Sequence, residues 1–133
     1  MKTIILAGGR GVRMGGVTRR IPKPLVEIGG TPMLLHIMRH YEAFGFREFI
    51  VALGYLGEML HESMRPMVDA HPKLQVDFVP TGLDTATGGR IKRLAPYIGG
   101  ETFMLTWGDG LSNVDLHELL DFHRAHGRLA TVT

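Results

Sequence analysis

The sequence predicts an α/β fold, a sandwich of helices around a largely parallel sheet. Short apolar, β-branched runs alternate along the chain with segments in which apolar residues recur at helical spacing. The 18 glycines are dispersed, which is typical of many tight turns between strands and helices rather than of a linker. The 133 residues are enough for one domain with a buried core.

The first strand and first helix are the clearest elements. Residues 2–7 are apolar and β-branched, as expected of a buried parallel strand. Thr31 can cap a helix that has Pro32 at its first position, where a missing N–H costs nothing, and Gly45 ends that helix. The apolar residues at helical spacing between them are Leu34, Ile37, Met38, Tyr41 and Phe44.

The middle of the chain continues the alternation. Residues 48–53 form a second predicted strand, followed by a short helix over residues 57–64 that ends before Pro66. Residues 74–79 alternate apolar and polar side chains, which predicts a third strand.

A polar loop rich in glycine and threonine is expected at residues 80–89. A short helix over residues 90–95 should stop near Pro96, and residues 102–107 form a fourth predicted strand.

The last predicted elements are one helix and one strand. Asn113 or Asp115 can cap a helix that runs to about His126 and is closed by Gly127. Residues 128–133 are expected to start a fifth strand. An open sheet that finished there would keep a bare edge, so we expect the chain to be the N-terminal part of a longer protein.

The turn after the first strand suits a nucleoside triphosphate. Gly8, Gly9 and Gly11 interrupt the strand, and a backbone without Cβ atoms can bring its N–H groups close to phosphate. Arg13 adds a fork of donors, and Lys23 adds a cation on a segment that is stiffened by prolines on both sides. Two separated cations beside a glycine turn are typical of a site that grips a polyphosphate.

Three other interpretations of this turn compete. It could be an ordinary strand-to-helix connection, because a glycine-rich turn alone is a weak signal. A P-loop does not fit, since no Gly-Lys-Ser/Thr follows. The glycine spacing is also poor for a dinucleotide fingerprint, and together with Lys23 it disfavours an NAD(P)-binding domain.

Composition excludes several classes of function. The net charge of +2 comes from 15 basic and 13 acidic residues without a long basic run, which does not favour nucleic-acid binding. The absence of cysteine excludes disulfides and thiolate metal sites, and structural histidines are favoured over a zinc site. No apolar run reaches the length of a membrane span and no leader pattern precedes the first strand, so a cytoplasmic enzyme is expected.

Several motifs resemble those of the sugar-1-phosphate nucleotidyltransferases. Leu6–Met14 and Arg19–Gly30 resemble the opening of that family. Thr87–Arg93, Trp107–Gly110 and Asp121–Gly127 are similar to its glucose-1-phosphate cytidylyltransferase branch. The resemblance implies a Rossmann-like three-layer αβα sandwich with a mainly parallel (mixed) sheet, of the nucleotide-diphospho-sugar transferase type. It also implies that residues 1–133 are the nucleotide-binding part of a longer domain.

The implied reaction transfers a nucleotidyl group from a nucleoside triphosphate to a sugar-1-phosphate, giving a nucleotide-sugar and pyrophosphate. CTP and glucose-1-phosphate are the substrates that the resemblance favours. A uridylyl- or thymidylyltransferase that acts on a related hexose-1-phosphate is the near alternative. A non-catalytic nucleotide-binding module is the alternative from another class, and homo-oligomer formation stays open.

The resemblance also implies roles for charged residues. Arg13 would hold the departing pyrophosphate and Lys23 would neutralise charge near the α-phosphate, which makes these two the predicted catalytic residues. Asp109, between Gly108 and Gly110, is the predicted ligand of Mg²⁺. The alternative for Asp109 is a plain Asp-Gly turn. A second metal carboxylate and the sugar contacts are expected beyond Thr133.

The nucleobase or ribose is expected against two glycine-containing segments. Thr87, Gly88 and Gly89 would cradle it, although Thr87 can equally cap a helix. Arg90 is a weaker candidate for phosphate. The predicted nucleotide-binding residues are Leu6, Ala7, Gly8, Gly9, Gly11, Arg13, Lys23, Thr87, Gly88 and Gly89.

Overall fold

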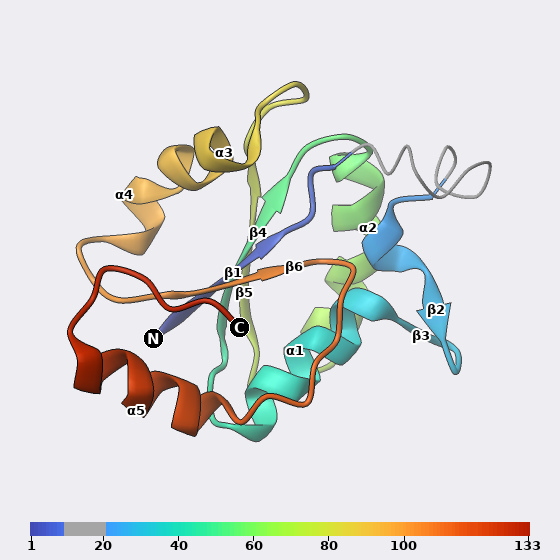
Figure 1. Cartoon of the computed structure of the whole chain (residues 1–133). Coiled ribbons are helices and arrows are strands. Elements are labelled where there is room, and N and C mark those ends of the chain that lie inside the picture. The colour runs from blue at the N-terminus through green and yellow to red at the C-terminus, as the bar shows by residue number, and fades with distance from the viewer. Residues whose placement is uncertain (10–20) are drawn as a thin grey trace.

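The computed structural model describes residues 1–9 and 21–133 as a sheet flanked by helices (Figure 1). The strands are β1 (Lys2–Leu6), β2 (Glu27–Ile28), β3 (Thr31–Pro32), β4 (Glu48–Leu53), β5 (Gln75–Pro80) and β6 (Met104–Trp107). The helices are the 3₁₀ helix η3 (Lys23–Leu25), α1 (Met33–Ala43), α2 (Gly57–Asp69), α3 (Thr87–Arg93), α4 (Ala95–Ile98) and α5 (Leu116–His126).

The central sheet has the strand order β5-β4-β1-β6, and its three pairings are all parallel. Alternate residues of β1 face opposite layers: Ile5 packs in the core with α1, α2 and the start of α5, whereas Ile4 and Leu6 pack in the core with α3 and α4. Figure 1 shows α3 and α4 on one side of the sheet and α1 and α2 on the other. The predicted αβα sandwich with a mainly parallel sheet is confirmed.

A small hairpin, which we did not predict, follows η3. β2 pairs with β3 in an antiparallel manner, and the two residues between the strands, Gly29 and Gly30, have φ values of 59° and 74°. Positive φ at both central positions is typical of a type I′ turn, which glycine adopts without strain. Thr31 lies in β3 rather than capping α1, so the predicted cap is wrong and α1 starts at Met33.

Two predictions based on proline are wrong. α2 continues through Pro66 to Asp69, because Met64 and Val68 extend the apolar face of the helix and are buried in the core. Pro96 does not stop a helix but lies in the first turn of α4, where its missing N–H needs no partner. α3 also begins at Thr87, earlier than the residue 90 that we expected.

The end of the chain agrees in part with expectation. Asp115 caps α5, since its Oδ1 accepts hydrogen bonds from the backbone N–H groups of His117 (2.8 Å) and Glu118 (3.1 Å). Gly127 follows the helix with a φ of 63°. The predicted strand at residues 128–133 is absent from the described part of the chain, because this segment pairs with no neighbouring strand.

No helix within residues 1–9 and 21–133 combines the length and the apolar character that crossing a bilayer requires.

Candidate functional site

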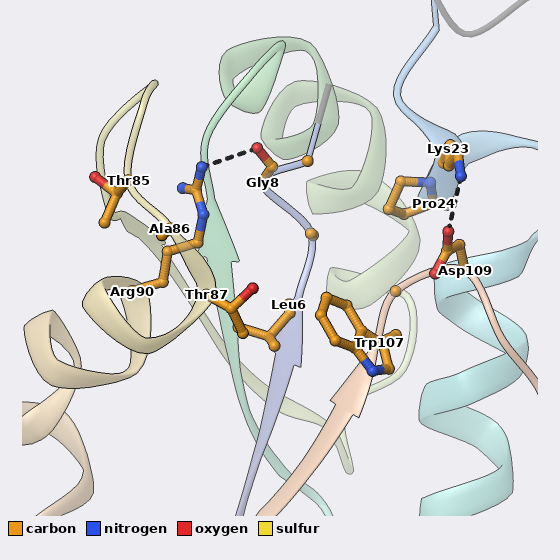
Figure 2. A pocket seen from close by; sticks show the side chains of 13 residues that line it. Leu6, Gly8, Lys23, Pro24, Thr85, Ala86, Thr87, Arg90, Trp107 and Asp109 are labelled. Carbon is orange, nitrogen blue, oxygen red and sulfur yellow. Dashed lines mark hydrogen bonds and ion pairs between the residues drawn. The ribbon is translucent and has the colours of Figure 1, made fainter. Parts of the chain in front are cut away.

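A cavity of about 470 Å³ opens at the carboxyl ends of β1 and β6, facing the start of α3 (Figure 2). Ligands of parallel α/β sheets gather at this end of the strands, and the volume is that of a typical small-molecule site. The lining residues are Leu6, Ala7, Gly8, Gly9, Lys23, Pro24, Thr85, Ala86, Thr87, Arg90, Trp107, Gly108 and Asp109.

Most of the predicted nucleotide-binding residues line this one cavity. Those that the structure brings together are Leu6, Ala7, Gly8, Gly9, Lys23 and Thr87, together with the predicted metal ligand Asp109. Gly88 and Gly89 do not line the cavity but form the first turn of α3. Gly11 and Arg13 lie outside the residues that the structure describes, so their roles stay predictions.

A cation and a carboxylate meet at one wall of the cavity. The Nζ atom of Lys23 lies 3.1 Å from Oδ2 of Asp109, and the two side chains are 20% and 42% exposed. Figure 2 shows the pair beside Pro24. Lys23 is held by η3, where the N–H of Leu25 donates to the carbonyl of Pro22 (2.9 Å). The two charged groups are therefore fixed by segments that are far apart in the sequence.

Gly108 sets the path of the segment that carries Asp109. Its N–H donates to the carbonyl of Leu6 (3.0 Å), which extends the pairing of β6 with β1. A Cβ atom on Gly108 would lie 3.0 Å from Cγ of Pro24 and 3.2 Å from the carbonyl oxygen of Leu6. The lack of a side chain at this position therefore lets the strand end pass close to η3 and brings Asp109 within reach of Lys23.

The opposite wall is formed by the segment that leads into α3. Thr85, Ala86 and Thr87 line it, and the N-cap residue of α3 is Ala86, without a side-chain cap hydrogen bond. The alternative role of Thr87 as a side-chain helix cap is therefore wrong. Gly89 packs under this wall, since a Cβ there would approach Cγ2 of Thr85 to 2.9 Å.

Sequence reasoning underestimated Arg90. Its side chain lines the cavity, but the residue is only 6% exposed and its guanidinium donates to backbone carbonyls, including that of Gly8 (Figure 2). Burial lowers the pKa of Arg90, the charge of Arg93 lowers it further, and Asp84 acts in the opposite direction. The buried guanidinium is therefore part of the framework, which the charge pattern alone did not indicate.

Trp107 is a second lining residue that sequence reasoning gave no role in the site. It ends β6 beside Leu6, is 59% exposed, and is the single tryptophan of the sequence. An exposed indole at a cavity wall offers an apolar surface to a ring, and its fluorescence reports on what binds there.

The donor groups fit one hard cation only in part. Asp109 supplies one carboxylate, and no group of three or more His, Cys, Asp or Glu side chains that could hold a metal exists among residues 1–9 and 21–133. Mg²⁺ commonly takes one or two carboxylates and completes its shell with phosphate oxygens and water. The site thus fits Mg²⁺ that arrives with a polyphosphate, and it does not form a complete protein cage.

Comparisons with known proteins identify the family to which the chain is similar. The whole chain aligns at 45% identity with the probable glucose-1-phosphate cytidylyltransferase of Bacillus subtilis (strain 168), covering 59% of it. It aligns at 40% identity with the glucose-1-phosphate cytidylyltransferase of Salmonella typhimurium (strain LT2), covering 60%. HddC from Yersinia pseudotuberculosis, solved in complex with GMP-PN, matches 92% of this chain with a TM-score of 0.78 and 31% identity, over 53% of its own length.

The chain spans about three fifths of the length of these curated relatives. Residues 2–133 match the family described as Nucleotidyl transferase, so the match runs through every described element of the fold and through the cavity. The chain therefore belongs to the nucleotidyl transferase family.

Proposed function

We propose that this chain is the nucleotide-binding part of a sugar-1-phosphate nucleotidyltransferase that uses CTP and glucose-1-phosphate. The observation that carries the proposal is the cavity in which the glycine turn after β1, Lys23 and Asp109 meet from three segments. The relatives named glucose-1-phosphate cytidylyltransferase support the choice of substrates. In the reaction an oxygen of the sugar phosphate attacks the α-phosphorus, the bond to the β-phosphate breaks, and pyrophosphate leaves.

Charge neutralisation is the main task of the site, because both substrates are anions. Lys23 is paired with Asp109, and both side chains are partly exposed. An ion pair of this kind contributes about 0–1 kcal/mol, so Lys23 can turn to a phosphate at little cost. A bound triphosphate would then compete for the ammonium group and leave the carboxylate of Asp109 available.

We propose that the carboxylate thus released is a ligand of Mg²⁺. Bound there, Mg²⁺ would supply positive charge to the phosphate oxygens. The carboxylate of Asp109 would provide oxygen ligands for Mg²⁺. The ammonium group of Lys23 would lie beside the same phosphates as a second positive charge. The expected cytoplasmic location and the oligomeric state stay predictions.

Nucleotide binding tests the proposal directly. Titration of the chain with CTP, UTP, dTTP, ATP and NADH, each with and without Mg²⁺, should show saturable binding of a pyrimidine triphosphate that Mg²⁺ strengthens. Calorimetry measures the affinity, and the fluorescence of Trp107 reports whether the ligand enters this cavity. Tighter binding of UTP or dTTP than of CTP would show that the proposed base, cytosine, is wrong and that uracil or thymine takes its place. Preference for NADH, or binding of no nucleotide, would contradict the proposed function.

Arg13 separates phosphate recognition from base recognition. We expect Arg13→Ala to weaken the binding of CTP far more than that of cytidine, because a guanidinium fork binds phosphate oxygens and a nucleoside has none. Calorimetric titration with both ligands measures the two losses. Arg39→Ala removes an arginine of α1 that is not part of the cavity lining and is the matched control. Equal losses for CTP and cytidine would contradict the phosphate role of Arg13.

A further inference from the structure

Three loop ends converge on the guanidinium of Arg90. The residue belongs to α3, yet its acceptors follow β1, end β4 and follow β5. Nη2 donates to one carbonyl after β1 and one after β5, whereas Nη1 donates to groups at the ends of β4 and β5. The acceptors are the carbonyls of Gly8 (3.0 Å), Leu53 (3.1 Å), Gly82 (2.7 Å) and Leu83 (3.3 Å), and the hydroxyl of Thr81 (2.7 Å).

Two glycines make the space that this guanidinium occupies. A Cβ atom on Gly8 would lie 2.4 Å from Nη1 of Arg90, and one on Gly54 would lie 2.5 Å from the same atom. Neither glycine has a positive φ, so backbone conformation does not explain them. At Gly8 the three atoms nearest to such a Cβ all belong to Arg90, whereas at Gly54 the carbonyl oxygen of Gly8 is almost as close (2.6 Å) as the guanidinium. We call this space, bounded by Gly8 and Gly54, the arginine slot.

The acceptors of Arg90 among the described residues are uncharged carbonyl and hydroxyl groups, and the charge of Asp84 acts on the guanidinium only as a smaller electrostatic effect. A buried charge is costly unless its donors are satisfied, and an apolar side chain would fill the same volume more cheaply. A planar fork with five N–H groups, however, can join several chain segments at fixed angles, which neither an apolar residue nor a lysine can do. Compared with an apolar side chain, the buried guanidinium therefore stabilises the fold less, but it fixes the loop ends after β1, β4 and β5 relative to one another.

We infer that Arg90 is a positioning residue that fixes the two walls of the cavity relative to each other. Through Gly8 it holds the turn that is proposed to approach the phosphates, and through Thr81 and Gly82 it holds the loop that leads to Thr85–Thr87. The inference rests on the proposed function, since those walls are the proposed phosphate and base sides of a nucleotide site.

Arg93 provides a built-in comparison. It lies one turn further along α3, and its Nη1 donates to the carbonyl of Thr81 (2.6 Å) and to the hydroxyl of Thr85 (2.7 Å). Arg93 thus holds the loop after β5, and within the part of the chain that the structure describes its hydrogen bonds do not reach the turn after β1. A substitution of Arg93 removes contacts within the wall formed by the loop after β5. A substitution of Arg90 removes the contacts that join this wall to the turn after β1.

Binding of CTP and of cytidine tests the role of Arg90. We expect Arg90→Gln to lower the affinities for CTP and for cytidine by similar factors, roughly tenfold or more. The reason is that several charge-assisted hydrogen bonds between the walls are lost. Arg93→Gln should weaken both less, and Lys92→Gln, an exposed change on the same helix, should leave both unchanged. A loss for CTP without a loss for cytidine would show a direct phosphate contact and overturn the inference, as would unchanged binding of both.

Chemical rescue distinguishes positioning from a general loss of folding. Millimolar methylguanidinium should restore CTP binding to Arg90→Ala, whereas methylammonium, which carries charge without the planar fork, should not. Arg90→Lys should be intermediate between the native protein and Arg90→Gln. If Arg90→Gln does not fold, Arg90→Lys takes its place in the titrations. Equal effects of the two additives would contradict a slot that is specific for a guanidinium.

A stability cycle tests the arginine slot without any nucleotide. Gly8→Ala should lower the thermal midpoint of the native protein but do so much less in an Arg90→Ala background, because the group that the methyl displaces is then gone. If Gly8→Ala lowered the thermal midpoint equally in both backgrounds, Gly8 and the guanidinium of Arg90 would not be coupled, and the arginine slot would be wrong. If the native chain bound no nucleotide, the proposed function would fail while this cycle still decided whether Arg90 joins the loops.

Discussion

Under the proposed function, Asp109→Asn should abolish the Mg²⁺-dependent turnover of the full-length protein, with a loss on the order of 10³-fold in kcat. The amide keeps the shape of the side chain but supplies no negative charge to a cation. The fold should survive, because the side chain is 42% exposed and its ion pair with Lys23 is a partly exposed one. Release of pyrophosphate from CTP and glucose-1-phosphate measures the rate, and thermal unfolding measures the stability.

Asp121→Asn is the matched control for this experiment. It removes the same charge from an exposed position on α5, where the carboxylate lies 4.0 Å from Arg124. Turnover of this variant should equal that of the native enzyme. If Asp109→Asn turned over as fast as the control, Asp109 would be a plain turn residue and the proposed metal site would be wrong.

Lys23→Met should lower kcat/KM by about 10²- to 10³-fold, since a preorganised cation beside the reacting phosphates is removed. Lys23→Arg should recover only part of the rate, because a planar fork does not replace a compact ammonium group. The loss should appear with CTP and be small for the binding of cytidine, which separates it from the uniform loss expected for Arg90→Gln. Steady-state kinetics and calorimetry give the two quantities.

Lys73→Met removes a charge from an exposed residue that is not part of the cavity lining, and it should leave the kinetics unchanged. A Lys23→Met enzyme that kept the native kcat/KM would show that the ion pair with Asp109 is a surface contact without a role in the reaction.

Hydrophobic periodicity was sufficient to predict the layers of the fold. The paired core strands β1 and β4 and the amphipathic face of α1 follow from local pattern alone. The errors arose where tertiary contacts decide. Pro66 is accommodated because Val68 gains burial beyond it, and residues 128–133 lack a partner strand. The Gly29-Gly30 hairpin has a local signal, a glycine pair, but its two strands have only two residues each and are too short to show an alternating pattern.

The candidate site was predictable where residue type and strand end coincide. Gly8 and Asp109 follow the predicted first and fourth strands, Lys23 stands out between two prolines, and the topology brings all three to one cavity. Arg90 was not predictable in its present role, because its acceptors are backbone carbonyls and carbonyls leave no trace in the sequence. The role of Gly54 could not be predicted either, because the fold brings its close neighbours, the guanidinium of Arg90 and the carbonyl of Gly8, to it from distant parts of the chain.

The position of β6 in the sheet has a consequence for how the protein is made. β4 pairs with one edge of β1, whereas β6 pairs with the other, some hundred residues after β1 leaves the ribosome. Before β6 pairs with it, β1 has one unpaired edge, and the ion pair between Lys23 and Asp109 cannot form. Because contacts between segments that are far apart in the sequence form late, the cavity cannot be complete before β6 has been synthesised. A nascent chain that ends before β6 can assemble much of the core and still have no place to hold a nucleotide.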